Sequence, residues 1–135
     1  MSLLSGPLFG SLADKIGAYK TLILIFFMLS IANFLLTLDI PSEMLFFSVT
    51  FFGLAAWVIP SLVTLLTSFE FGKEKTAQVF SLITIVFAIG QTLGPIAAGY
   101  IYDLSSSFKL VFLICAILTL LGMILSYVFT NKNVN

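Results

Sequence analysis

Four long runs without charge restrict the fold of this chain more than any other feature. The runs hold 18 residues between Lys20 and Asp39, 26 between Glu43 and Glu70, 27 between Lys75 and Asp103, and 22 between Lys109 and Lys132. About 20 residues of α-helix, rising ~1.5 Å each, cross the roughly 30 Å hydrocarbon layer of a bilayer. Backbone N–H and C=O groups find no water in that layer, so each run is predicted to be helical.

The sequence therefore predicts an all-α membrane protein, organised as one partial domain over residues 1–135. Its four transmembrane helices are expected near residues 20–38, 44–68, 75–101 and 108–130. Residues 2–13 are also uncharged but too short to cross, and no basic region precedes them as in a signal peptide. We interpret them as the last half of a helix, because Gly6, Pro7 and Gly10 suit close helix packing. A short interfacial segment is the alternative.

Composition argues against an enzyme, a metal site or a nucleic-acid partner. The chain is 60% hydrophobic and 9% charged, its net charge is zero, and it has no histidine and one cysteine, Cys115. Without histidine the common nucleophile–base pairs and metal-ligand spacings are missing. The glycine-rich run GQTLGP at 90–95 lacks the Gly-Lys-Ser/Thr ending of a phosphate loop. No cofactor is expected.

The lysines predict how the helices are oriented. Cytoplasmic loops of membrane proteins carry an excess of lysine and arginine. One alternating topology puts five of the six lysines on the cytoplasmic side, namely Lys15, Lys20, Lys73, Lys75 and Lys132, and leaves Lys109 outside. We expect a multi-pass protein with a cytoplasmic C-terminus, in a bacterial or archaeal inner or plasma membrane.

A repeated pattern links the two halves of the chain. GPLFGSLAD at 6–14 and GPIAAGYIYD at 94–103 both read Gly-Pro, a short gap, Gly, three residues and Asp. The copies start 88 residues apart, enough for three membrane helices, so they run in opposite directions. Inverted repeats are typical of secondary transporters, although Gly and Pro are common in membrane helices and chance is the alternative.

The charged turn near the start of the chain carries a known signature. Its residues Gly10, Asp14, Lys15, Gly17 and Lys20 resemble, in order and spacing, the cytoplasmic-loop motif G-x3-D-R/K-x-G-x2-R/K of the major facilitator superfamily. The stretch at 90–112 resembles the eleventh helix and the start of the twelfth in the same family. The run from IPSL at 59–62 to GQTLGP resembles the YbfB/YjiJ-like transporters of that superfamily.

The resemblance implies a position and a function. The chain would run from the end of helix 8 to helix 12, within the C-terminal six-helix bundle, and would move a small solute by alternating access. The motif would form a gate latch, with Gly17 allowing a tight reversal through positive φ and Asp14 facing a helix N-terminus. A plain charged turn is the alternative. Lys15 and Lys20 would contact Asp14 or anionic lipid headgroups.

Candidate solute contacts lie in the second and third full spans. Pro60 should kink the span at 44–68, which the resemblance places beside the central cavity with Trp57 and Thr64 as cavity residues. Thr84 and Gln91 follow at helical spacing in the next span, and bonding to neighbouring helices is an equally open role for them. Asn33 is expected to bond a neighbouring helix. The residues expected to pack helices closely are Gly6, Pro7, Gly90, Gly94, Pro95 and Gly99.

Partners and rival functions follow from the number of helices. Four spans and a stub do not enclose the usual cavity between transporter halves, so the missing N-terminal half or another copy is expected beside membrane lipid and the solute. One alternative is a small four-helix exporter that dimerises, but no carboxylate lies within a span to serve it. A non-transporting membrane subunit is the other.

Overall fold

The structure, a computed structural model, describes residues 2–38 and 42–132. In these ranges the chain forms α-helices and no strand, which confirms the predicted all-α class. The helices are α1 (Ser2–Ile16), α2 (Ala18–Leu35), α3 (Ser42–Ala56), α4 (Ile59–Phe71), α5 (Lys73–Ser105) and α6 (Lys109–Lys132). Four segments are long and apolar enough to cross a membrane: Ala18–Leu35, Leu45–Phe71, Lys73–Ser105 and Lys109–Thr130.

The span predicted at 44–68 consists of two rods rather than one kinked helix. α3 ends at Ala56, a turn covers Trp57 and Val58, and α4 begins at Ile59. The amide of Val58 bonds the Ala55 carbonyl at 3.3 Å, so the turn is tighter than an α-helix. Pro60 explains the break, because its ring removes the N–H that would bond residue 56 and disfavours helical backbone just before it.

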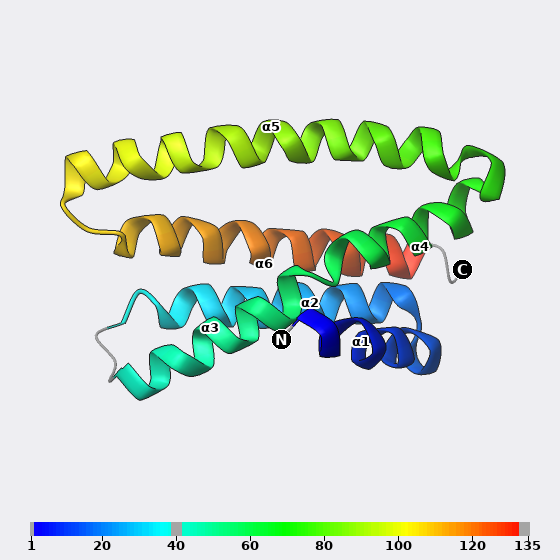
Figure 1. Cartoon of the computed structure of the whole chain (residues 1–135), viewed down its shortest axis with the longest axis horizontal. Helices are drawn as coiled ribbons and strands as arrows, with labels where there is room; N and C mark the ends of the chain where they lie inside the picture. The colour runs from blue at the N-terminus through cyan, green and yellow to red at the C-terminus, as the bar shows by residue number, and fades with distance from the viewer. Residues whose placement is uncertain (1, 39–41, 133–135) are drawn as a thin grey trace.

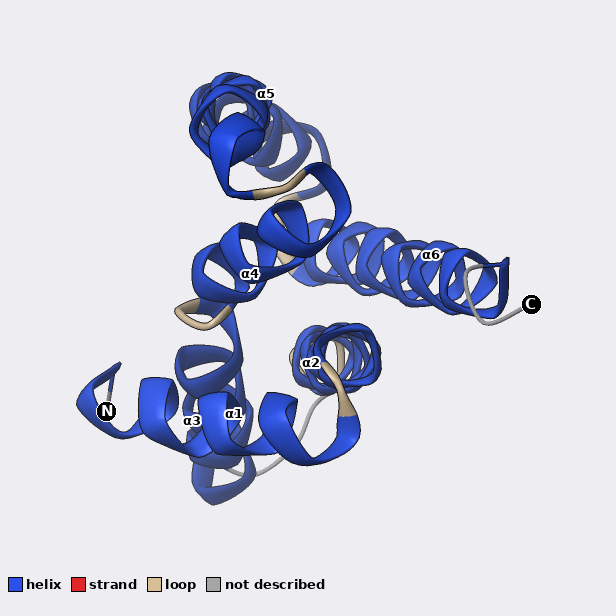
Figure 2. Cartoon of the chain, turned by 90° about the vertical axis from the view of Figure 1, so that its right-hand side faces the viewer, coloured by secondary structure: helices blue, strands red, loops and turns tan. Residues whose placement is uncertain are grey.

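The core of the bundle surrounds α2. This helix contacts α1, α3, α4 and α6 (Figures 1 and 2). Its Ile25 and Thr21 are fully buried. The buried cluster draws on four helices and comprises Phe9, Ala13, Ala18, Ile25, Leu29, Ala55, Val58, Leu62 and Leu66. α2 is thus packed on several sides, and this packing fixes the position of the α1–α2 turn at its start.

Polar contacts between helices supplement this core. Ser30 donates to the Ala116 carbonyl of α6 at 3.0 Å, and Ser48 of α3 donates to the Ala32 carbonyl at 2.5 Å. Gly122 lets α6 approach α2, because a Cβ there would lie 3.2 Å from the Phe26 ring. Helices in lipid associate through such small residues and hydrogen bonds, since lipid tails are as apolar as the side chains.

Asn33 behaves differently from the prediction. Its side-chain amide donates to the Leu29 carbonyl of its own helix at 2.7 Å, although the residue is buried. A carbonyl four residues back is always within reach of an asparagine amide in a helix. The expected bond to a neighbouring helix is therefore wrong.

α5 stands apart from the rest of the bundle. It contacts α4 and α6, and none of its 33 residues is buried. Figure 2 shows α5 separated from α2, with α4 as the bridge between them. The longest helix of the chain is thus left largely uncovered.

The turns between helices gather at two ends. The α1–α2 turn, the α4–α5 turn at Gly72 and the end of α6 lie at one end of the molecule, on the right in Figure 1. The α5–α6 turn and the end of α2 lie at the other. The segments that carry Lys15, Lys20, Lys73, Lys75 and Lys132 therefore lie at one end of the bundle.

We predict that Ser48→Ala lowers the unfolding free energy by about 0.5–2 kcal/mol, because an interhelical bond to the Ala32 carbonyl is lost. Loss of helical circular dichroism during SDS titration of the protein in mixed micelles measures it. Thr50→Ala is the matched control, since the Thr50 hydroxyl bonds Phe46 within α3 at 2.7 Å. Equal effects of the two changes would contradict the prediction.

Candidate transport site and gate loop

Gly17 shapes the turn between α1 and α2. Its φ of 94° and ψ of 146° confirm the expected positive φ and lie in a region that only glycine adopts without strain. The Gly17 amide bonds the Ala13 carbonyl at 2.9 Å, and its carbonyl accepts from the Thr21 amide and hydroxyl, each at 3.0 Å. The glycine thus ends one helix and starts the next with no connecting loop.

The charged residues of the motif surround this turn. Asp14, Lys15 and Lys20 are all exposed, and a Cβ on Gly10 would meet no atom within 4 Å. Among the described residues no hydrogen bond or ion pair involves the Asp14 carboxylate. The latch role of Asp14 therefore stays a prediction for a helix beyond this bundle.

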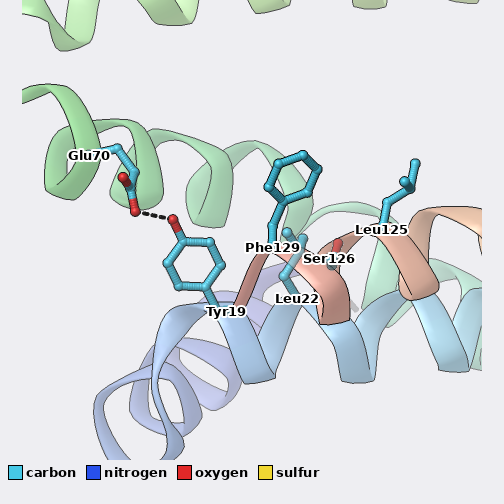
Figure 3. Close-up of a pocket in the computed structure, with 6 residues that line it drawn as sticks. All are labelled: Tyr19, Leu22, Glu70, Leu125, Ser126 and Phe129. Atoms are coloured by element: carbon cyan, nitrogen blue, oxygen red, sulfur yellow. Dashed lines mark hydrogen bonds between the residues drawn. The ribbon is translucent and has the colours of Figure 1, made fainter. Parts of the chain in front are cut away.

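A contact that the sequence did not indicate joins the same end of the molecule. The Tyr19 hydroxyl, beside the motif, donates to the Glu70 carboxylate at the end of α4, 51 positions away (Figure 3). Both residues line a cavity of about 360 Å³ between α2, α4 and α6, together with Leu22, Leu125, Ser126 and Phe129. The sequence indicated only that Tyr19 and Glu70 belong to charged stretches assigned to the same side of the membrane.

Two of the predicted cavity residues come together between α4 and α5. Pro60 and Thr84 line an apolar cavity of about 220 Å³ with Phe80 and Phe87, where the Thr84 hydroxyl already donates to the Phe80 carbonyl at 2.8 Å. The other lining residues are Ile59, Val63 and Ile83. The apolar lining of this cavity suits an apolar group of a ligand.

The remaining candidates are more dispersed. Trp57 is 69% exposed at the α3–α4 break, and Gln91 is exposed farther along α5. Thr64 donates to the Pro60 carbonyl at 2.8 Å and lines a separate groove of about 450 Å³. We name this space the α4–α5 groove; it is lined by Ser61, Thr64, Leu65, Ser68, Lys73 and Thr76.

Among the residues expected to pack helices closely, those that the structure describes in α5 face open space or are exposed. A Cβ at Gly90, Gly94 or Gly99 would meet no atom within 4 Å, and Pro95 is exposed inside α5. Gly6 and Pro7 lie in α1, but their side-chain surroundings fall outside the described part of the structure. Their packing role stays a prediction.

These features define a multi-pass α-helical membrane protein with a glycine-centred turn at its lysine-rich end. Residues 1–134 match the family model of the Major Facilitator Superfamily, and the chain belongs to that family. Members of this family are transporters and not enzymes, in agreement with the class expected from the sequence.

Two relatives were found among known proteins. The chain is 29% identical over 104 residues to monocarboxylate transporter 14 of Mus musculus, and 30% identical over 104 residues to monocarboxylate transporter 14 of Homo sapiens. Each match covers 77% of this chain but 19% of the relative. The chain thus spans about a fifth of the length of these relatives. No solved structure matches it.

We predict that Gly17→Ala lowers the unfolding free energy by about 1–3 kcal/mol, because alanine is strained at this φ and ψ. Gly10→Ala should be neutral or slightly stabilising, since Gly10 lies inside α1 and a Cβ there meets open space. Thermal unfolding of the two variants in detergent, monitored by circular dichroism, compares their stabilities. A Gly17→Ala protein as stable as Gly10→Ala would refute the strain.

Proposed function

We propose that this chain forms part of a transporter that moves a small solute across the membrane by alternating access. The family match over residues 1–134 carries the proposal. The signature around Gly17 and the opposed Gly-Pro-Asp ends support it, since Asp14 lies two residues before the end of α1 and Asp103 two before the end of α5. Those ends lie at opposite ends of the molecule (Figure 1).

The chain acts in this proposal as the segment from the end of helix 8 to helix 12. α1 serves as the half-helix, α3 and α4 together as the tenth helix, and α5 as the eleventh. The likeness of residues 59–95 to YbfB/YjiJ-like transporters belongs to the same proposal. The lysine-rich end and the C-terminus face the cytoplasm of a bacterial or archaeal cell, as the positive-inside rule favours.

Further membrane helices complete the transporter. The uncovered length of α5 and the open space beside Gly90 and Gly94 support a partner, either the N-terminal half or a second copy. Solute contacts come from the neutral groups Trp57, Pro60, Thr64, Thr84 and Gln91. Their lack of charge means that an anionic solute, such as the monocarboxylates for which the relatives are named, would need its cation elsewhere.

Single-cysteine labelling tests the orientation. In a Cys115→Ala background we expect Lys15→Cys and Lys73→Cys to react with a membrane-impermeant maleimide from the cytoplasmic side alone. Asp103→Cys should react from outside, and the cysteine-free chain should not react. Labelling of positions 15 and 73 from opposite faces would overturn the topology and, with it, the transporter assignment.

Transport is tested in proteoliposomes with radiolabelled lactate as a small monocarboxylate and glycerol as a neutral solute. We expect uptake of at least one when this chain is reconstituted with the remaining helices, and none with this chain alone. Thr64→Cys should then become accessible from both sides in turn. Uptake by this chain alone would instead favour the dimeric exporter. No uptake, either by this chain alone or with the remaining helices, would favour a non-transporting subunit.

A further inference from the structure

The α4–α5 groove lies at the lysine-rich end, and of the proposed solute contacts only Thr64 lines it. It is formed where α4 ends at Phe71 and α5 begins at Lys73, with Gly72 between them at φ 76°. We propose that this groove binds the phosphate of an anionic phospholipid, with the Lys73 ammonium as the cation and serine hydroxyls as donors.

The charge within the groove is of one sign. Lys73 is its only charged lining residue, and no carboxylate contributes to its walls. The nearest acidic residue of α4 in sequence, Glu70, accepts the Tyr19 hydroxyl and lines the cavity toward α2 and α6 instead (Figure 3). Glu74, the residue after Lys73, lies in the first turn of α5 but does not line the groove, so an anion there meets Lys73 with no acidic group in the lining.

Hydrogen-bond donors accompany the lysine. The hydroxyls of Thr64 and Thr76 are occupied, since they donate to the Pro60 and Gly72 carbonyls at 2.8 Å. For Ser61 and Ser68 no hydroxyl hydrogen bond is recorded in the part of the chain that the structure describes. The groove also lies at the start of α5, where Gly72 provides no side-chain cap and the helix N-terminus favours an anion.

The position of the groove favours a lipid over a soluble anion. The span Leu45–Phe71 ends here, so the groove lies where an apolar segment meets the membrane surface. Phe69 and Phe71 are 71% and 55% exposed in the same turn, and Leu65 lines the groove itself. A ligand with an anionic head and apolar chains satisfies both kinds of surface, and cytoplasmic leaflets supply such lipids.

Electron paramagnetic resonance with spin-labelled lipids tests the proposal on the full chain in bilayers. We measure the motionally restricted fraction of phosphatidylglycerol relative to phosphatidylcholine with the same acyl chains. A preference of about fivefold is expected, the size that one lysine near an anionic surface confers. Lys73→Gln should remove most of this preference and leave only the part that exposed lysines such as Lys15 and Lys20 contribute, whereas Lys73→Arg should retain it.

Two controls keep the outcome decisive. Lys75→Gln removes the same charge two residues away, outside the groove, and should leave most of the preference intact. Ser68→Ala removes a donor without changing charge and should lower the preference even if Lys73→Gln folds poorly. Equal losses in Lys73→Gln and Lys75→Gln, or no change in Ser68→Ala, would overturn the site. Displacement of phosphatidylglycerol by inorganic phosphate at constant ionic strength would overturn the lipid as its ligand.

Discussion

The fold depends on the need to satisfy backbone polar groups where water is absent. Each N–H and C=O within the hydrocarbon layer must bond inside the protein, and the α-helix does this within a single segment. The requirement extends to side chains, since the hydroxyls of Thr84, Thr92 and Thr119 donate to carbonyls three or four residues earlier in their own helices. What remains for association is close packing and a few bonds such as Ser30 to Ala116.

Because helices associate by close packing and a few interhelical hydrogen bonds, α2 is central and α5 is not. α2 has small or hydroxylated residues at Ala18, Thr21 and Ala32, which let neighbouring helices approach, and all three are buried. α5 carries glycines as well, but among the described residues no atom lies within 4 Å of a Cβ built on Gly90, Gly94 or Gly99. The same chemistry thus yields a packed helix where partners are present and an open surface where they are not.

Charge placement made much of the architecture predictable. The uncharged runs delimited the spans, and the spacing of the motif indicated positive φ at Gly17, because few other residues fit a one-residue helix reversal. The break before Pro60 was anticipated as a kink. Its exact form depends on how the backbone at Trp57 and Val58 relaxes, which sequence periodicity does not report.

The contacts of the candidate site were less predictable. The bond between Tyr19 and Glu70 joins residues 51 positions apart, and it requires the relative rotation of two helices that no local pattern encodes. The Asn33 amide donates to the Leu29 carbonyl of its own helix, a partner that the sequence alone does not distinguish from one in a neighbouring helix. Pro60 and Thr84 were selected separately for polarity and backbone chemistry, and packing brought them to one cavity.

The turn at Trp57 and Val58 also has a mechanical consequence. α3 is bonded to α2 through Ser48, whereas α4 continues through Gly72 into α5. The turn therefore lets the chain change direction between α3 and α4, while Leu62 and Leu66 of α4 still pack into the core around α2. Pro60, two residues beyond the turn, lacks the N–H that a continuous helix would need there. The bend between α3 and α4 is therefore fixed by the sequence.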